Sequence, residues 1–262
     1  MREAVIEAAR FLVGHSGEPI TLGDVADHVG YSPFHLSRSF ERLLGQPPGQ
    51  FLAAHRFQRA KRLLLSTDER VVDVCHEVGF TSVGTFTKRF TAVVGHSPVE
   101  FRRLPDVLAD FPPRPVIVPG ADRDGGVVTG SARLTPAARA LLSGAAAVYV
   151  GLFPRRSARG CPVSGTLLGE SAGFLLTAVP PGTYWLLASA LPAAGGALDQ
   201  LVPGRIVAGM AAEPVLVTRQ APLHHRDVWL DVHADWTVPV LVALPPLASA
   251  RTRRTGPPVP MP

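Results

Sequence analysis

The side chains with the clearest chemical potential lie on two stretches of the sequence, about fifty residues apart. Each stretch predicts a helix with one apolar face and one face that carries hydrogen-bond donors. Arg38 in the first stretch and Lys88 in the second are the strongest donors. A guanidinium can pair with O6 and N7 of guanine, and an ammonium can hold a base edge or a phosphate. These residues therefore offer recognition of a nucleic acid rather than catalysis.

The two stretches are parts of a near-repeat that runs over residues 24–48 and again over residues 73–98. Both copies hold a short apolar helix, a glycine that permits a left-handed turn, and a second helix that ends at another glycine. The positions that agree are Gly30 and Gly79, Phe40 and Phe90, Gly45 and Gly95, and Pro48 and Pro98. A short helix, a tight turn and an amphipathic helix make a helix-turn-helix unit. The sequence therefore predicts two such units in tandem.

Helical spacing divides each second helix into a buried and an exposed face. The residues expected in the core are Leu36, Phe40 and Leu43-Leu44 in the first unit, and Phe86, Phe90 and Val93-Val94 in the second. The outward faces carry Phe34, Ser37, Arg38 and Arg42 in the first unit, and Val83, Gly84, Thr87 and Lys88 in the second. The core positions agree and the outward positions differ, which indicates one scaffold used twice.

Local signals place both units within a helical region over residues 1–104. Thr21 can cap the first short helix, and Asp24 stands where a capping box would have Glu or Gln. Ser32 can cap the helix that follows. Residues 48–66 predict a long amphipathic helix between the two units.

Residues 22–102 resemble the DNA-binding domain of the AraC/XylS family of transcription regulators. The matching pieces are Gly30-Tyr31-Ser32, Leu36-Ser37-Arg38-Ser39-Phe40, Gly45, Arg56, Ala60, Leu63-Leu64, Val78-Gly79-Phe80, Phe86-Thr87-Lys88-Arg89-Phe90 and Gly95-His96-Ser97-Pro98-Val99-Glu100-Phe101-Arg102. The resemblance implies a seven-helix domain that binds double-stranded DNA, with two recognition helices whose separation a long helix fixes. Two adjacent major-groove segments on one face of DNA lie about 34 Å apart, so one chain could span both.

Carried over position by position, the resemblance assigns DNA contacts to both outward faces. The residues concerned are Phe34, Ser37 and Arg38 in the first unit, and Val83, Gly84, Thr87 and Lys88 in the second. Further candidates, for phosphate contacts, are Arg42, Arg59 and Arg62. Arg38 is the strongest candidate for a base contact, which is worth about 1–3 kcal/mol of discrimination. Val83 and Gly84 have no hydrogen-bonding side chain, so the second unit would read thymine methyls and shape more than base edges.

These assignments have structural alternatives. A single arginine on a helix is more often solvated than a base reader, and Phe34 could be packed instead. Lys88 could hold a phosphate rather than a base. Arg56 lies on the apolar side of the long helix, so we expect it to join the two halves through an internal ion pair. The tandem arrangement itself has no comparable alternative, because chance would rarely produce both copies with matching positions.

The composition changes after residue 104. Residues 105–125 are rich in proline and predict a stiff linker. Residues 126–247 hold short apolar runs separated by turn signals, which predict an all-β, sandwich-like domain with a helix-like insertion at residues 135–143. The expected strands are 126–134, 146–153, 161–168, 173–179, 183–191, 214–219 and 226–233, with 238–244 as a weaker candidate. Residues 248–262 have the composition of a disordered tail.

Part of this second region resembles the transthyretin-like, carboxypeptidase-regulatory-like β-sandwich. The pieces that carry the resemblance are Gly173-Phe174-Leu175-Leu176 and Pro180-Pro181-Gly182-Thr183-Tyr184. It implies that Phe174 and Tyr184 pack between sheets. It implies no function, because such domains are often accessory modules. The expected fold class is therefore multidomain α and β: an all-α tandem helix-turn-helix domain followed by an all-β, sandwich-like domain.

The remaining features argue against other functional classes. Cys75 and Cys161 lie in different halves without CxxC spacing, which is typical of reduced thiols in a cytoplasmic protein. No nucleophile motif or phosphate loop is present, and no apolar run reaches the roughly 20 residues of a membrane span. The formal net charge of +5 is shared between both halves, so charge does not locate the DNA-binding part. The residues that could suggest a metal site are His224-His225, Asp231, His233 and Asp235. Their spacing matches no known ligand set, so we expect neither a metal nor a cofactor.

The sequence thus predicts a cytoplasmic, sequence-specific transcription regulator that is not an enzyme. Its C-terminal domain would serve in sensing, dimerisation or partner contact, and the candidate partners besides DNA are RNA polymerase, a small-molecule effector and a second copy of the chain. Two alternatives stay open: fusion to an enzyme such as a DNA-alkylation repair module, which would need an activated cysteine such as Cys161, and an interaction protein without specific DNA binding. The DNA-binding domain comes first, whereas family members more often carry it last, so the usual N-terminal sugar-binding barrel is not expected.

Overall fold

The computed structural model describes residues 1–110, 112–168 and 172–248, and the chain divides into two compact units. The helical unit comprises Met1–Arg102 together with Ala234–Leu241. The β-rich unit comprises Arg103–His233 and the chain from Val242 on. The expected order of a tandem helix-turn-helix region followed by a strand-rich region is confirmed. Across the described ranges, no helix combines the length and apolar character that crossing a membrane requires.

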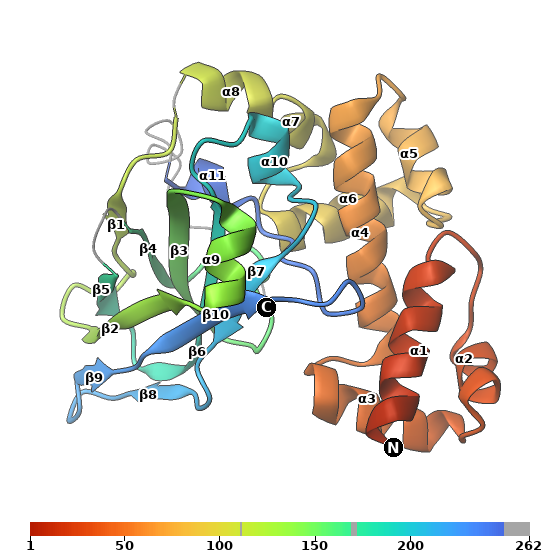
Figure 1. The fold of residues 1–262 in the computed structure, drawn as a ribbon, viewed down its shortest axis with the longest axis horizontal. Coiled ribbons are helices and arrows are strands. Elements are labelled where there is room, and N and C mark those ends of the chain that lie inside the picture. The colour runs from red at the N-terminus through yellow and green to blue at the C-terminus, as the bar shows by residue number, and fades with distance from the viewer. Residues whose placement is uncertain (111, 169–171, 249–262) are drawn as a thin grey trace. The chain divides into compact units, whose positions relative to one another are not determined.

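The helices of the helical unit follow the pattern in the sequence. Their bounds are α1 (Arg2–Gly14), α2 (Leu22–Val29), α3 (Pro33–Leu44), α4 (Pro48–Ser66), α5 (Val71–Glu77), α6 (Val83–Val94) and α7 (Pro98–Arg102). The seven helices that the family resemblance implied are present. Figure 1 shows α4 running between the group α1–α3 and the group α5–α6.

Side-chain caps fix where the helices of both helix-turn-helix units begin. Thr21 accepts a hydrogen bond from the backbone N–H of Asp24, and the Asp24 carboxylate accepts one from the N–H of Thr21. Aspartate therefore completes the capping box, and the hydrogen bonds that its carboxylate accepts from the N–H and the hydroxyl of Thr21 lower the pKa of Asp24. Ser32 and Ser82 cap α3 and α6, each accepting from the N–H three residues later. Gly30 ends α2 in the left-handed conformation, with φ of 69°.

Each half of the helical unit has a buried core. Leu36 and Phe40 are fully buried in a cluster with side chains of α1, α2 and the start of α4. Phe86 and Phe90 are equally buried in the other half. The expected core assignment is wrong at one position, because Leu43 is 40% exposed. Helical spacing defines an apolar stripe, but it does not say how far along the helix the covering elements extend.

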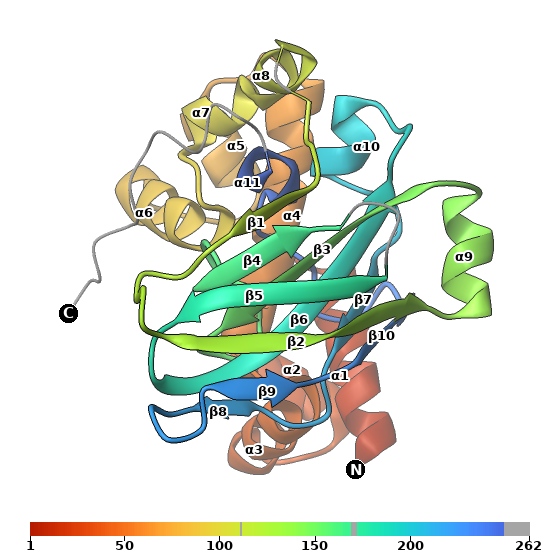
Figure 2. The same cartoon turned by 90° about the vertical axis from the view of Figure 1, so that its left-hand side faces the viewer.

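The strands of the β-rich unit join into one ten-stranded sheet in the described residues, with the order β1-β4-β3-β6-β7-β10-β2-β5. Beside this path, β8 pairs with β6 and β9 with β2. The strands are β1 (Val116–Val118), β2 (Gly126–Leu134), β3 (Ala146–Phe153), β4 (Ser164–Leu167), β5 (Gly173–Val179), β6 (Gly182–Pro192), β7 (Val207–Met210), β8 (Val215–Val217), β9 (Leu223–His225) and β10 (Val228–Val232). Figure 2 shows the curled sheet, with α9 (Pro136–Leu142) beyond the end of β2.

The curled sheet encloses one core, which produces sandwich-like packing from a single sheet. β5 and β6 follow each other in the chain without pairing: β5 pairs with β2, and β6 with β3, β7 and β8. The turn at 180–182 thus carries the chain between distant parts of the sheet. Phe174 and Tyr184 are both buried in this core, which lies within one curled sheet rather than between the two sheets that the resemblance implied. The parallel pairing of β10 with β2 makes the sheet continuous.

Several segments differ from the sequence-based expectation. The expected linker at 105–125 holds most of α8 (Leu104–Asp110) and the strand β1. The weaker strand candidate at 238–244 forms no strand, and α11 (Leu244–Leu247) follows it. The sequence does not predict β7, β9 or α10 (Ala197–Leu201), because three to five residues are too few to display a periodicity. Most of the expected tail, residues 249–262, lies outside the described residues.

Candidate nucleic-acid interface

The first recognition helix, α3, presents an aromatic ring and a guanidinium on its exposed face. Phe34 is 68% exposed, so it is not a packed core residue. Arg38 lies one turn further along and is also exposed, and its guanidinium carbon is 5.6 Å from the centroid of the Phe34 ring. This cation–π contact holds the arginine against the ring. The pair offers an apolar and a charged surface side by side, which suits a base methyl group next to a base edge.

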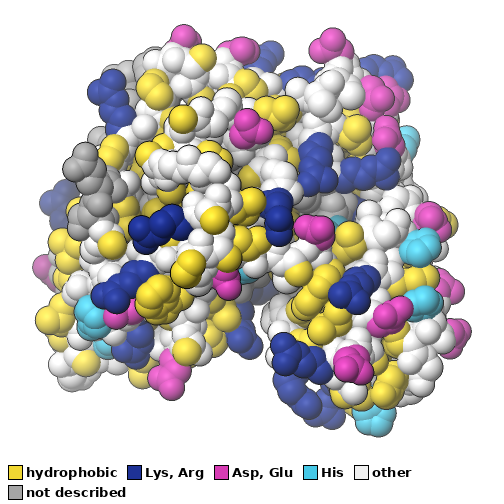
Figure 3. All heavy atoms as spheres, in the orientation of Figure 1, with side chains coloured by type: hydrophobic (Ala, Val, Ile, Leu, Met, Phe, Trp, Pro, Cys, Tyr) yellow, Lys and Arg dark blue, Asp and Glu magenta, His cyan; other side chains and the backbone are white. Residues whose placement is uncertain are grey.

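The other two predicted residues of α3 differ in exposure. Arg42 is exposed one turn beyond Arg38, and Ser37 is half-buried. Phe34, Arg38 and Arg42 follow an i, i+4, i+8 spacing and therefore lie along one face of the helix. In Figure 3, Lys and Arg side chains gather over the part of the helical unit where Figure 1 places α3.

The second recognition helix, α6, presents smaller side chains. Gly84 is exposed, and a Cβ added to it would meet no atom within 4 Å. Lys88 is exposed one turn later, whereas Val83 and Thr87 are half-buried. The carbonyl of Thr87 accepts a hydrogen bond of 2.8 Å from the Thr91 hydroxyl. Of the four predicted residues on α6, Lys88 alone carries a charge, whereas the predicted residues of α3 include Arg38 and Arg42.

Arg56 of α4 joins the two helix-turn-helix units. Its guanidinium donates to the carbonyls of Ser16 and Glu18, at 2.8 and 2.7 Å, and to the carbonyl of Gly79 at 2.8 Å. The expected link is present, but its acceptors are backbone carbonyls in loops rather than the expected carboxylate. Carbonyls outside helices need donors, and one guanidinium can serve several of them. Gly79 has a φ of 85°, and an added Cβ would lie 2.9 Å from the Arg56 guanidinium carbon.

The two further phosphate candidates on α4 differ in availability. Arg59 forms an ion pair with Glu77, with Nη2 and Oε1 2.9 Å apart, which links α4 to the end of α5. Its Nη1 also donates to the Glu77 carbonyl at 3.3 Å. Arg62 is exposed. Arg59 is therefore engaged within the unit, and Arg62 is the better placed of the two for a phosphate.

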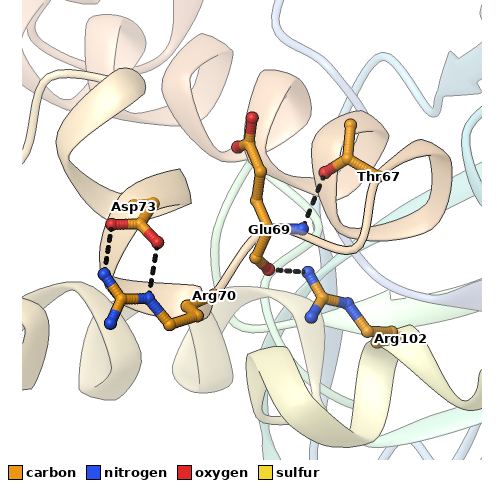
Figure 4. Close-up of polar contacts among 5 residues, drawn as sticks. All are labelled: Thr67, Glu69, Arg70, Asp73 and Arg102. Carbon is orange, nitrogen blue, oxygen red and sulfur yellow. Dashed lines mark hydrogen bonds and ion pairs between the residues drawn. The ribbon is translucent and has the colours of Figure 1, made fainter.

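The loop between α4 and α5 is anchored from both sides, as Figure 4 shows. Arg102 of α7 donates to the carbonyl of Glu69, and the N–H of Glu69 donates to the Thr67 hydroxyl at 3.4 Å. Arg70 forms a two-point ion pair with Asp73, at 2.8 and 3.2 Å, which lowers the pKa of Asp73. These contacts tie the loop that leads into α5 to α7 and to the first turn of α5.

Lys61 is a residue that the sequence patterns do not single out. It is only 1% exposed, its Nζ donates to the carbonyl of Leu241 at 3.3 Å, and it lies 5.6 Å from the centroid of the Phe101 ring. Burial, and then the charge of Arg62, lower the pKa of Lys61 to about 7. In the sequence, Lys61 occupies an apolar position of the long helix, and this is the signal that could have identified it.

The histidines and aspartates of the β-rich unit do not converge. Asp231 accepts a hydrogen bond of 2.6 Å from the Thr135 hydroxyl. The Nε2 atom of His225 lies 3.4 Å from Oδ1 of Asp227. Among residues 1–110, 112–168 and 172–248, no group of three or more His, Cys, Asp or Glu side chains is placed to hold a metal ion.

Comparison with known proteins matches the helix-turn-helix region. Residues 25–104 match a family model described as a helix-turn-helix domain. The HTH-type transcriptional activator AarP of Providencia stuartii is 33% identical over 98 residues, which cover 37% of this chain and 73% of AarP. The right origin-binding protein of Escherichia coli strain K12 is 32% identical over 96 residues, which cover 37% of this chain but only 33% of that protein. The solved DNA-binding domain of AdpA, a global transcriptional factor in complex with a target DNA, has 27% identity and a TM-score of 0.37, covering 40% of this chain and 94% of that one.

Proposed function

Because the chain belongs to the AraC family of transcription regulators, we propose that it binds double-stranded DNA sequence-specifically through α3 and α6. The observation that carries this proposal is the exposed pair of Phe34 and Arg38. Because the Phe34 ring is exposed to water, it does not stabilise the core and is available for contact with a ligand. Arg38 is held against this ring and is therefore preorganised to enter the major groove of DNA. Arg38 would pair with guanine O6 and N7, and Phe34 would contact the methyl group of a neighbouring thymine.

The second recognition helix, α6, would mainly fix the position of the protein along the DNA and would contribute less than α3 to base recognition. Lys88 supplies a charge for a phosphate or a base edge, while Val83 and Gly84 allow close apolar approach. α4 has 19 residues, and at 1.5 Å per residue it is about 28 Å long. This length is close to the roughly 34 Å between adjacent major-groove segments on one face of DNA. One chain could therefore place α3 and α6 in successive turns of the groove, with Arg42 on a phosphate.

The β-rich unit would serve in sensing, dimerisation or contact with a partner such as RNA polymerase, rather than in catalysis. A repair enzyme would need an activated thiol, which has a lowered pKa. Partial desolvation instead raises the pKa of Cys161, although this residue is exposed at the surface. Treatment of the folded protein with a methylating reagent, followed by mass spectrometry, tests this assignment. Because Cys161 is exposed, we expect it to be methylated no faster than an ordinary accessible thiol, and much faster modification would favour the enzyme.

Selection of binding sites from random duplexes tests the DNA-binding proposal. The wild type should enrich one motif, and Arg38→Ala with Lys88→Ala should abolish the enrichment. Arg38→Ala alone should cost about 1–3 kcal/mol at a single guanine. The matched control is Arg10→Ala with Arg139→Ala, which removes the same charge from exposed positions outside α3 and α6 and should keep the motif. A wild type without any motif, or a motif that the first double variant retains, would contradict the proposal.

Salt dependence separates the two kinds of contact. Arg42→Ala should weaken binding to all sequences alike and reduce the slope of log K against log salt by about 1, because it removes a phosphate contact. Phe34→Ala should leave that slope unchanged and relax the preference at one base pair. Titrations of the selected duplex and its point variants at several salt concentrations measure both effects.

A further inference from the structure

Residues 234–241, which we call the return segment, follow strand β10 and belong to the helical unit. Trp236 and Val238 pack against the buried cluster of α1, α2, α3 and the start of α4. The N–H and the hydroxyl of Thr237 both donate to the carbonyl of Ala234, at 2.9 and 2.8 Å, which shapes the segment into a turn. The core of the first helix-turn-helix unit is thus completed by side chains from the far end of the described chain.

The return segment also covers two ionisable side chains of α4. Lys61 donates to the carbonyl of Leu241, and the His55 imidazole lies near the backbone of Thr237, with its Nε2 buried and without a hydrogen-bond partner among the described residues. Burial lowers the pKa of His55 to about 4 and that of Lys61 to about 7. Without the return segment, both side chains would lie nearer to water, where the lysine is fully charged. Docking of the segment therefore takes both side chains out of water.

α4 is shared by both helix-turn-helix units, so contacts along it act on both. Trp236 and Val238 reach the core of the first unit, and Leu241 reaches Lys61, which lies against Phe101 of α7. From residue 55 to residue 61 these contacts extend about 9 Å along the helix axis. A helix held over this length keeps a fixed orientation between α3 and α6.

We propose that the return segment positions α4 for DNA recognition, so that DNA affinity depends on its docking. The segment directly continues β10, so a ligand or partner that displaces this strand would also displace the segment. It would then be the covalent route by which the β-rich unit controls the recognition helices. This inference rests on the proposed DNA binding, and it makes Trp236 and Val238 positioning residues that touch no DNA themselves.

Hydrogen–deuterium exchange and DNA binding of the full chain test the proposal together. Trp236→Ala with Val238→Ala should raise exchange in α1 and α4 by about tenfold or more, since truncated core side chains make local opening easier. Exchange in β3 and β6 should stay at the wild-type level. Affinity for the duplex selected by the wild type should fall by about tenfold, a typical size for coupling between sites. The matched control, Leu223→Ala with Trp229→Ala, removes a leucine and a tryptophan that are 68% and 57% exposed and should change neither measurement.

The outcomes separate this proposal from the proposed function. Wild-type exchange in α1 and α4 of the double variant would overturn the docking, and raised exchange with wild-type affinity would overturn the positioning role. If the wild-type protein selects no duplex, both the proposed function and the positioning role are overturned. This outcome needs no variant, so it is distinguishable from failure of the positioning role alone. If the double variant aggregates, Val238→Ala alone should show both changes at smaller amplitude, and absence of either change would again overturn the proposal.

Discussion

Replacing Lys61 by methionine is expected to stabilise the helical unit at neutral pH. Lys61→Met keeps an unbranched side chain of similar length and removes an ammonium from a site that is 1% exposed. It also removes the hydrogen bond to the Leu241 carbonyl, which is worth about 1–2 kcal/mol. Whether removal of the charge or loss of the hydrogen bond has the larger effect on the free energy of unfolding depends on the cost of burying the ammonium. The shift in the pKa of Lys61 gives the size of that cost.

The magnitude follows from the shift in pKa. Burial, and then the charge of Arg62, lower the pKa of Lys61 from 10.5 to about 7. One unit of pKa corresponds to about 1.4 kcal/mol, so the two protonation states differ by about 5 kcal/mol. At neutral pH about 4 kcal/mol of this acts against folding, because the unfolded chain is fully protonated at this lysine and the folded chain only half. After loss of the hydrogen bond, Lys61→Met should raise the free energy of unfolding by about 2–3 kcal/mol.

The pH dependence distinguishes this account from better packing alone. Between the folded and unfolded pKa values of Lys61, the unfolded state binds more protons, so wild-type stability rises with pH over this window. Lys61→Met lacks this rise, and its advantage should shrink by about 2 kcal/mol from pH 7 to pH 9. Urea denaturation followed by far-ultraviolet circular dichroism measures both quantities, with Lys88→Met as the same substitution at an exposed site. A variant less stable than the wild type at neutral pH, or a difference that does not vary with pH, would refute the reasoning.

Three further substitutions test the packing of the helical unit, each by urea denaturation. Thr21→Ala removes the hydroxyl that caps α2 and should lower the free energy of unfolding by about 1 kcal/mol, while Thr21→Ser should restore it. Arg56→Lys cannot reach all three carbonyls and should cost about 2–4 kcal/mol, and a loss below 1 kcal/mol would mean that water replaces the guanidinium without penalty. Burial lowers the pKa of His55 to about 4, so the unfolded state binds more protons between pH 6.5 and 4 and stability falls as the pH falls. His55→Gln should remove up to about 3 kcal/mol of that acid loss, and equal acid sensitivity in both proteins would exclude a buried neutral His55.

Much of the fold is predictable because its signals are local. Thr21, Ser32 and Gly30 act on neighbouring backbone groups, so the start and end of α2 and the start of α3 can be derived from a few adjacent residues. The bounds of β2, β3 and β5 follow from apolar runs between turn residues. The contacts of residues 234–241 are different in kind. Their partners on α4 lie far away in the sequence, and nothing in the segment itself distinguishes a strand of the sheet from a cover for a helix.

The candidate site divides in the same way. The i, i+4 spacing of Phe34 and Arg38 predicts that they share a face, and the structure adds that the ring and the guanidinium lie against each other. The engagement of Arg59 with Glu77 could not be predicted, because it depends on how α4 and α5 cross. The acceptors of Arg56 were equally hidden, since unpaired loop carbonyls have no signature in a sequence.

The difference between the two recognition helices changes what the rest of the helical unit must do. If α3 reads bases through Phe34 and Arg38 while α6 offers Lys88 as its charged donor, specificity at the second groove segment depends on where α6 is placed more than on what it carries. That placement comes from Arg56, from the anchored loop before α5 and from the contacts that hold α4. Substitutions at these positions should therefore change the tolerated spacing between the two halves of the selected motif. Substitutions on α3 should instead change which bases the motif prefers. Selection of binding sites with Arg56→Lys tests this difference between the two helices. We expect the same base preferences as the wild type and a broader range of spacings between the two half-sites. Altered base preferences with an unchanged spacing would contradict it.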